Sequence, residues 1–134
     1  MTTYAPVGSG SAITCLPAAA AGVTITAGAA GVAGSYAQID DGTGVPSDTF
    51  TIVGIAFDTP SAAMVGTVEI ANGAAASEVV VAAAHYEVAT DAAVIAPIIL
   101  PPSGPIDGGT RLAVRLTTVG GGETIKASLM MREV

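Results

Sequence analysis

Near the end of the chain, apolar and polar residues alternate with the two-residue period of strands buried on one face. Between residues 110 and 117 the apolar positions are Leu112, Val114 and Leu116. Between residues 124 and 132 they are Ile125, Ala127, Leu129 and Met131. The Gly-rich segment 119–123 separates the two runs. The pattern predicts two strands joined as a β-hairpin.

Further strand-like segments precede this pair. Residues 50–57 are apolar on both faces, which is typical of a central strand that is covered on each side. Residues 94–100 contain Pro97, which confines that strand to an edge or a bulge because proline has no N–H for the ladder. The remaining strand candidates are 23–26, 35–39, 65–70 and 78–84, with a turn at Asn72-Gly73. About eight short strands separated by turns predict an all-β fold, an antiparallel β-sandwich of jelly-roll type.

The first 47 residues differ from the rest in composition. Tracts of Ala and Gly, such as residues 18–21 and 27–31, surround the two short strand candidates of this region. The sequence leaves two alternatives open here, an arm with a few strands or a segment integrated into the core. With 134 residues the chain is one domain by length. We expect an Ala/Gly-rich N-terminal arm over residues 1–47 and a β-sandwich core over residues 48–134.

The charged residues are few and unevenly distributed. The net charge is −7, which argues against binding to nucleic acid or to an anionic membrane surface. The uncharged stretch 16–33 contains Pro and several Gly residues, and no cation precedes it, so we expect neither a membrane segment nor a signal peptide. All four cations follow residue 110, and they are Arg111, Arg115, Lys126 and Arg132.

Pairing of the last two strands would place these four cations on one side of a sheet, because paired residues share a face. One interpretation is a solvated face whose charges discourage edge-to-edge aggregation. The other is a contact face for the carboxylates of a neighbouring subunit or partner. Under the second interpretation Arg111, Arg115, Lys126 and Arg132 are the candidate partner-contact residues.

The side chains that could carry chemistry are scattered. His85 is the one histidine, and we interpret it as a structural residue at a strand end. A nucleophile turn of the Gly-x-Ser-x-Gly type is absent from the sequence. Asp40-Asp41-Gly42 lacks the spacing of an EF-hand calcium loop and is interpreted as a turn, with a looser oxygen-ligand site that includes Asp48 or Asp58 as the alternative. Cys15 has no partner and no nearby cation, and it is interpreted as a small packing residue. We expect no catalytic residue, metal or cofactor, and therefore no enzyme.

The succession of strands in the C-terminal part resembles that of small virion structural proteins of tailed bacteriophages. Closest in character are the β-sandwich capsid decoration (cement) proteins and related head or tail appendages. The resemblance covers residues 48–134 and is one of pattern. The segments that carry it are 50–55, 68–70 with Gly73, 78–81, Pro105 and 109–116.

This resemblance implies a non-enzymatic protein that binds the outer capsid surface as a homotrimer, clamps neighbouring major-capsid-protein subunits and stabilises the shell. It implies a location on the virion, with the host cytoplasm as the place of assembly. The alternative is a receptor- or carbohydrate-binding module of a head or tail fibre. Sugars stack on exposed aromatic rings, and the chain has three Tyr and no Trp. That scarcity favours the decoration protein.

Overall fold

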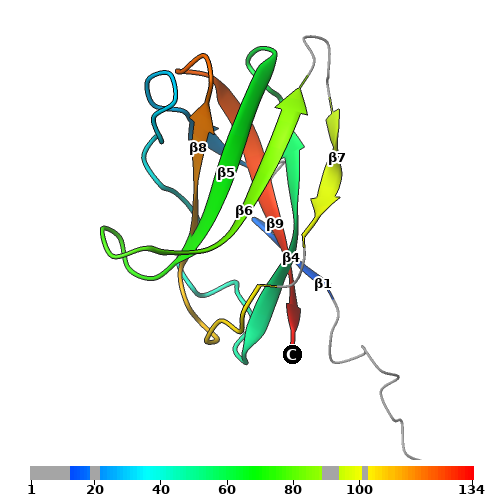
Figure 1. The fold of residues 1–134 in the computed structure, drawn as a ribbon. Helices are drawn as coiled ribbons and strands as arrows, with labels where there is room; N and C mark the ends of the chain where they lie inside the picture. The colour runs from blue at the N-terminus through cyan, green and yellow to red at the C-terminus, as the bar shows by residue number, and fades with distance from the viewer. Residues whose placement is uncertain (1–12, 19–21, 89–93, 101–102) are drawn as a thin grey trace, which may run out of the picture.

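The computed structural model describes residues 13–18, 22–88, 94–100 and 103–134, and side chains 94–97 are outside this description. The described residues form nine β-strands and no helix (Figure 1). The strands are β1 (Ile13–Leu16), β2 (Val23–Thr26), β3 (Ala37–Asp40), β4 (Phe50–Asp58), β5 (Met64–Asn72), β6 (Val79–Val88), β7 (Val94–Ile99), β8 (Leu112–Thr118) and β9 (Thr124–Glu133).

The strands form two antiparallel sheets that pack against each other. In sheet A the order is β1-β9-β4-β7, and β2 also pairs with β9; in sheet B the order is β3-β8-β5-β6. If β1 and β2 are counted as one interrupted strand, the first of eight strands pairs with the last. The second then pairs with the seventh, the third with the sixth, and the fourth with the fifth. This nested pairing is the topology of a jelly roll, so the predicted all-β sandwich is confirmed.

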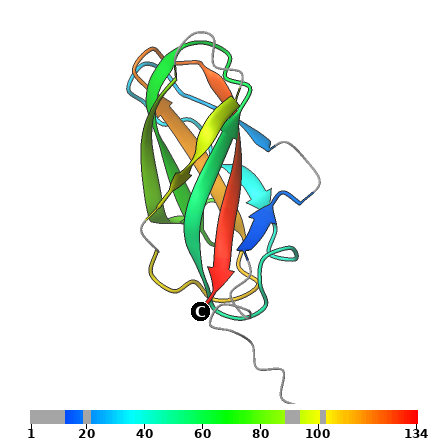
Figure 2. The same ribbon diagram turned by 90° about the vertical axis from the view of Figure 1, so that its right-hand side faces the viewer.

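The N-terminal strands belong to both sheets. β1 and β2 pair in succession with β9, through Leu16↔Leu129 and Val23↔Ala127, while β3 pairs with β8 in the other sheet. In Figure 2 these short blue and cyan strands lie against the long strands of the sandwich. Strands from both sides of the predicted boundary at residue 47 thus share one core. Residues 1–12 of the predicted arm lie outside the described residues.

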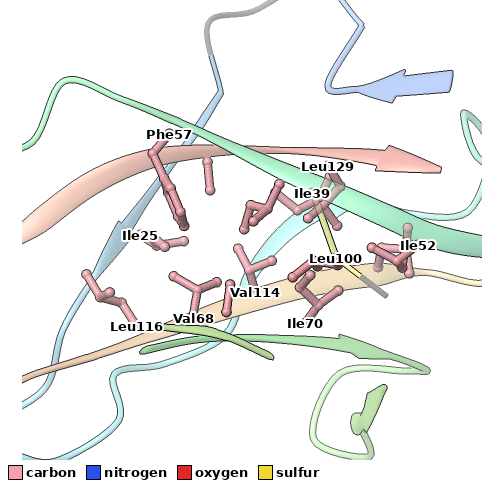
Figure 3. Packing of buried hydrophobic residues seen from close by; sticks show 14 of the residues in the cluster. Ile25, Ile39, Ile52, Phe57, Val68, Ile70, Leu100, Val114, Leu116 and Leu129 are labelled. Carbon is pink, nitrogen blue, oxygen red and sulfur yellow. The ribbon is translucent and has the colours of Figure 1, made fainter. Parts of the chain in front are cut away.

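The core lies between the sheets, and both contribute side chains to it (Figure 3). Phe57 of β4 stacks on Tyr86 of β6 with ring centroids 4.6 Å apart. Burying one Leu or Ile side chain contributes about 1.5–3 kcal/mol, so the many branched side chains compensate for the scarcity of aromatic ones. The largest fully buried side chains are Phe50, Ile25, Ile52, Ile55, Ile70, Ile106, Leu112, Leu116, Ile125, Leu129, Met131 and Val68.

Several local predictions are confirmed by the strand positions. β4 lies between β9 and β7 and is buried on nearly its whole length, as expected of a central strand. β7 is at the edge of sheet A, and its register with β4 shifts between Ile55 and Phe57, opposite the stretch that contains Pro97. Gly73 has φ 112°, which suits the predicted turn.

The predicted hairpin of the last two strands is wrong. β8 lies in sheet B and β9 in sheet A, so segment 119–123 crosses from one sheet to the other. Each strand has one apolar face, and these faces meet across the core instead of lying side by side. The crossing segment is held by backbone hydrogen bonds to residues 27–31, including Gly122 N to Gly28 O at 2.8 Å.

Candidate functional site

The four cations occupy opposite faces of the molecule. Because β8 and β9 turn their apolar residues toward the shared core, their polar residues point to opposite exteriors. Arg111 and Arg115 lie on the outside of sheet B, and Lys126 and Arg132 on the outside of sheet A. The predicted common stripe of positive charge is therefore wrong.

Arg115 is bound within its own sheet. Its Nε donates to Oε1 of Glu69 at 2.9 Å, across the register pair that joins β8 to β5. Its guanidinium lies over the ring of Tyr36, 4.7 Å from the centroid. The hydrogen bond with Glu69 raises the pKa of Arg115 further above its ordinary value. The charge of this residue is thus used inside the molecule.

Arg111 holds three segments of sheet B together. Its Nε donates to Oε1 of Gln38 at 2.8 Å, and its Nη1 donates to the Gly73 carbonyl at 3.2 Å and to Oε1 of Glu78 at 3.0 Å. The two charged side chains are 16% and 8% exposed. The pKa of Glu78 is lowered, first by a hydrogen bond from the backbone N–H of Glu78 to its own carboxylate and then by the hydrogen bond from Arg111. This residue, too, is a tether within the fold.

Lys126 and Arg132 have a different setting. Within the parts of the chain that the structure describes, neither forms an ion pair. Lys126 is half-buried and lies opposite Thr24 and Asp58, while Arg132 is exposed and lies opposite Ile13. These two cations are therefore the ones available to a partner.

Apolar side chains also lie on the outside of sheet A. Ile13 of β1 is 49% exposed and Ile99 of β7 is 76% exposed. Cys15 pairs in register with Met130, whose methyl group reaches over Gly54 of β4. We call this surface the outer A face, and define it as Ile13, Cys15, Ile99, Lys126, Met130 and Arg132.

Two interpretations of single residues are corrected by their positions. Cys15 is exposed, so it is not a packing residue; the next residue, Leu16, fills the core position instead. His85 does not lie at a strand end but within β6, exposed, with Nδ1 3.3 Å from Oγ1 of Thr67. The alternation of side chains along β1 would have predicted that Cys15 faces outward if Leu16 faces the core.

The aspartates of segment 40–44 serve the loop itself. Oδ1 of Asp40 accepts hydrogen bonds from the N–H groups of Gly42 and Gly44, at 2.8 and 2.9 Å. Oδ1 of Asp41 accepts from the hydroxyl and the N–H of Thr43, which lowers the pKa of Asp41. These contacts are those of a turn. The described residues contain no group of three or more His, Cys, Asp or Glu that could hold a metal ion.

The surface of the described residues has shallow hollows. One, of about 450 Å³, runs between β2 and segment 33–37 and is lined by small residues and Tyr36. Another, of about 390 Å³, is lined by residues that include Val65, Glu87 and Val119. The Tyr86 ring is buried in the core, and its burial raises the pKa of its hydroxyl. Tyr4 lies outside the described residues.

Comparisons with known proteins add little. No protein-family model matches the sequence, and no curated protein matches it. Two solved structures are similar over 92% of this chain, and the chain spans 33% of the length of each. They are of infectious bursal disease virus, Gx strain (16% identity, TM-score 0.42) and Gt strain (15% identity, TM-score 0.37). TM-scores this low carry no argument about function. No described segment forms a helix long and apolar enough to cross a membrane.

Proposed function

We propose that this protein is a non-enzymatic virion structural protein, a decoration protein that binds the outer surface of a capsid and stabilises the shell. The observation that carries the proposal is the outer A face, where exposed Ile13 and Ile99 share one side of sheet A with two cations that form no ion pair among the described residues. Protein interfaces commonly combine apolar side chains, which supply burial, with charged ones.

Charge explains why such a face would select a partner. The protein as a whole carries −7, yet the described outward positions of β9 and β4 present Lys126 and Arg132 together with the carboxylate of Asp58. A capsid surface with carboxylates would be attracted to this face and repelled by the others. Charge of this kind sets orientation and partner choice, while the apolar side chains supply the burial.

The face is also mechanically suited to clamping. Its strands β9 and β4 are the two central strands of sheet A and are anchored by fully buried residues such as Ile55 and Leu129. A rigid face loses little conformational freedom on binding, which favours affinity. We extend the proposal to a homotrimer on the major capsid protein, the arrangement that the sequence resemblance implies.

A non-enzymatic role is supported by the way in which the polar side chains are used. Glu69 and Glu78 hold arginines, and Asp40 and Asp41 hold their own loop. Each of these carboxylates is bonded to a neighbouring segment or within its own turn, and none of the four lines either of the two hollows described above.

A carbohydrate-binding module is the second candidate, because the hollow beside β2 is lined by Tyr36. Sugar rings stack on exposed aromatic faces, but one face of the Tyr36 ring is already covered by Arg115. Binding of glycans on an array by the isolated protein, with loss of binding in Tyr36→Ala, would favour this candidate over the decoration protein.

The proposal is tested by co-sedimentation with expanded capsids of the virion that carries the protein. Lys126→Ser with Arg132→Ser removes two positive charges from the outer A face, and we expect it to reduce binding at least about tenfold, because rim charges steer and orient association. The matched control is Ala74→Glu with Ala75→Glu, which makes the same change in net charge in an exposed turn of sheet B.

The two variants separate the outcomes. Wild-type and control binding with loss in the Ser variant supports the contact face. Equal binding by all three would contradict it, and absence of wild-type binding would contradict the decoration function itself. The number of copies bound at each capsid site, counted by electron cryo-microscopy of the decorated capsid, tests the trimer.

A further inference from the structure

Among the described residues, the edge of sheet B formed by β6 is long and unpaired. β6 has ten residues and lies at the end of the strand order, with β5 as its hydrogen-bonded neighbour. Of the other edges that the structure describes, β3 has four residues, β1 and β2 have four each, and β7 contains Pro97. β6 contains no Lys, Arg or Pro, the residues that protect edges against further pairing.

The second half of β6 is regular and rigid. From Ala83 to Val88 it pairs with β5 without a register shift, whereas a shift occurs earlier in the strand. Ala84, Tyr86 and Val88 are buried in the core, and the Tyr86 hydroxyl donates to Sδ of Met64 at 3.2 Å. Every second residue of an edge strand turns its N–H and C=O away from the sheet. This half of β6 is therefore a preformed template for another strand.

Two outward side chains of this template are complementary, because one can donate a hydrogen bond and the other can accept one. His85 and Glu87 are both exposed on the outside of sheet B, separated by inward-facing Tyr86. When Thr67 donates to Nδ1 of His85, the ring proton resides on Nε2, which is then free to donate to a carboxylate. The strand thus presents one donor and one acceptor, equidistant from Tyr86.

We propose that β6 pairs with β6 of a second copy of this chain, antiparallel, about a two-fold axis at Tyr86. In this register His85 of each copy lies opposite Glu87 of the other, because residues equidistant from the axis pair and share a face. Two complementary pairs arise from a single contact, as in any isologous interface. The four-stranded sheet B becomes an eight-stranded sheet.

The residue that lies opposite Glu87 distinguishes this register from other registers. A two-fold axis at Ala84 places Glu87 opposite Val81, and an axis at His85 brings the two imidazoles together. Neither gives the carboxylate a partner. The same complementarity favours a second copy over an unrelated strand, because the sequence of β6 itself supplies both members of each pair.

This inference does not rest on the proposed function. The contact uses the edge of sheet B and leaves the outer A face free, and a two-fold dimer differs in mass from the proposed trimer. The regular paired segment is short, residues 84–88 of each copy, so we expect a dimer that dissociates on dilution.

The test is sedimentation equilibrium of the full chain over a wide range of concentrations, with far-UV circular dichroism as the measure of folding. His85→Glu places two carboxylates opposite each other in both pairs and should weaken dimerisation at least about tenfold. The exchange variant, His85→Glu with Glu87→His, restores one His and one Glu in each pair and should restore the dimer.

Each outcome decides the matter. A wild-type dimer that is lost in the single variant and recovered in the exchange variant supports the pairing at Tyr86. A dimer that is insensitive to His85→Glu, or not recovered by the exchange, overturns it. So does a wild type that sediments as a monomer at every concentration, or as a trimer that both variants retain.

Discussion

Gly34 occupies a position where only a hydrogen atom fits. Its N–H donates to the Leu116 carbonyl of β8 at 2.8 Å, and a Cβ there would overlap the carbonyl oxygen of Thr26 at the end of β2. The residue therefore closes the side of the sandwich where sheets A and B approach each other. Part of the Ala/Gly-rich composition that predicted an arm is a steric requirement of this closure.

We expect Gly34→Ala to lower the free energy of unfolding by about 1–3 kcal/mol, the usual cost of inserting a methyl group where none fits. Gly104→Ala is the matched control, because a Cβ at Gly104 has no neighbour within 4 Å. Urea unfolding followed by circular dichroism measures both. Equal midpoints for the two variants would contradict the steric argument.

At the scale of elements, Arg111 joins segments of sheet B that are not connected by backbone hydrogen bonds between strands. Arg111 bonds to Gln38 of β3, to Gly73 in the turn after β5, and to Glu78 before β6. The sequence pattern gave no sign of these bonds. A cation that alternates with apolar residues has the same sequence pattern whether it binds a partner or forms hydrogen bonds within its own chain.

Replacement of Arg111 by Ala should loosen these segments while the sandwich stays folded. We expect faster amide hydrogen exchange in β3 and in the turn at residues 73–78, measured by mass spectrometry, because exchange reports local opening. Arg132→Ala on the outer A face should leave the exchange of the free protein unchanged. If the two variants behave alike, Arg111 is not a tether.

At the scale of the whole molecule, the chain closes by pairing its first strands with its last. β9 is flanked by β1 and β2 on one side and by β4 on the other. Such non-local pairing is expected to fold slowly, because loop closure precedes the stabilising contacts. It also makes the described N-terminal strands part of what stabilises β9.

A fragment of residues 48–134 should therefore fail to fold cooperatively. It lacks three strands, exposes new edges on β8 and β9, and removes Leu16, Ile25 and Ile39 from the core. Loss of a cooperative urea transition, compared with the full chain, is the expected result. A transition with the full-length midpoint would instead establish residues 48–134 as an independent domain.

The fold class and most strands were predictable because alternation of burial is a local property of sequence. The apolar residues on both faces of β4 predicted its central position in a sheet. Pro97 in the same way predicted the edge position of β7. Pairing is not local. β8 and β9 each bury one face, and that pattern is identical for neighbours within a sheet and for strands that face each other across a core. For this reason the sequence placed the four cations on one face, whereas the structure divides them between the two outer faces.

The exposure of Cys15 has a practical consequence. It is the one cysteine of the chain, and it lies on the outer A face opposite Met130. A thiol-reactive dye would therefore label the protein at a single known place, without any engineered residue. Protection of that thiol during assembly would map the covered side of the sandwich directly, so the protein already carries its own footprinting probe.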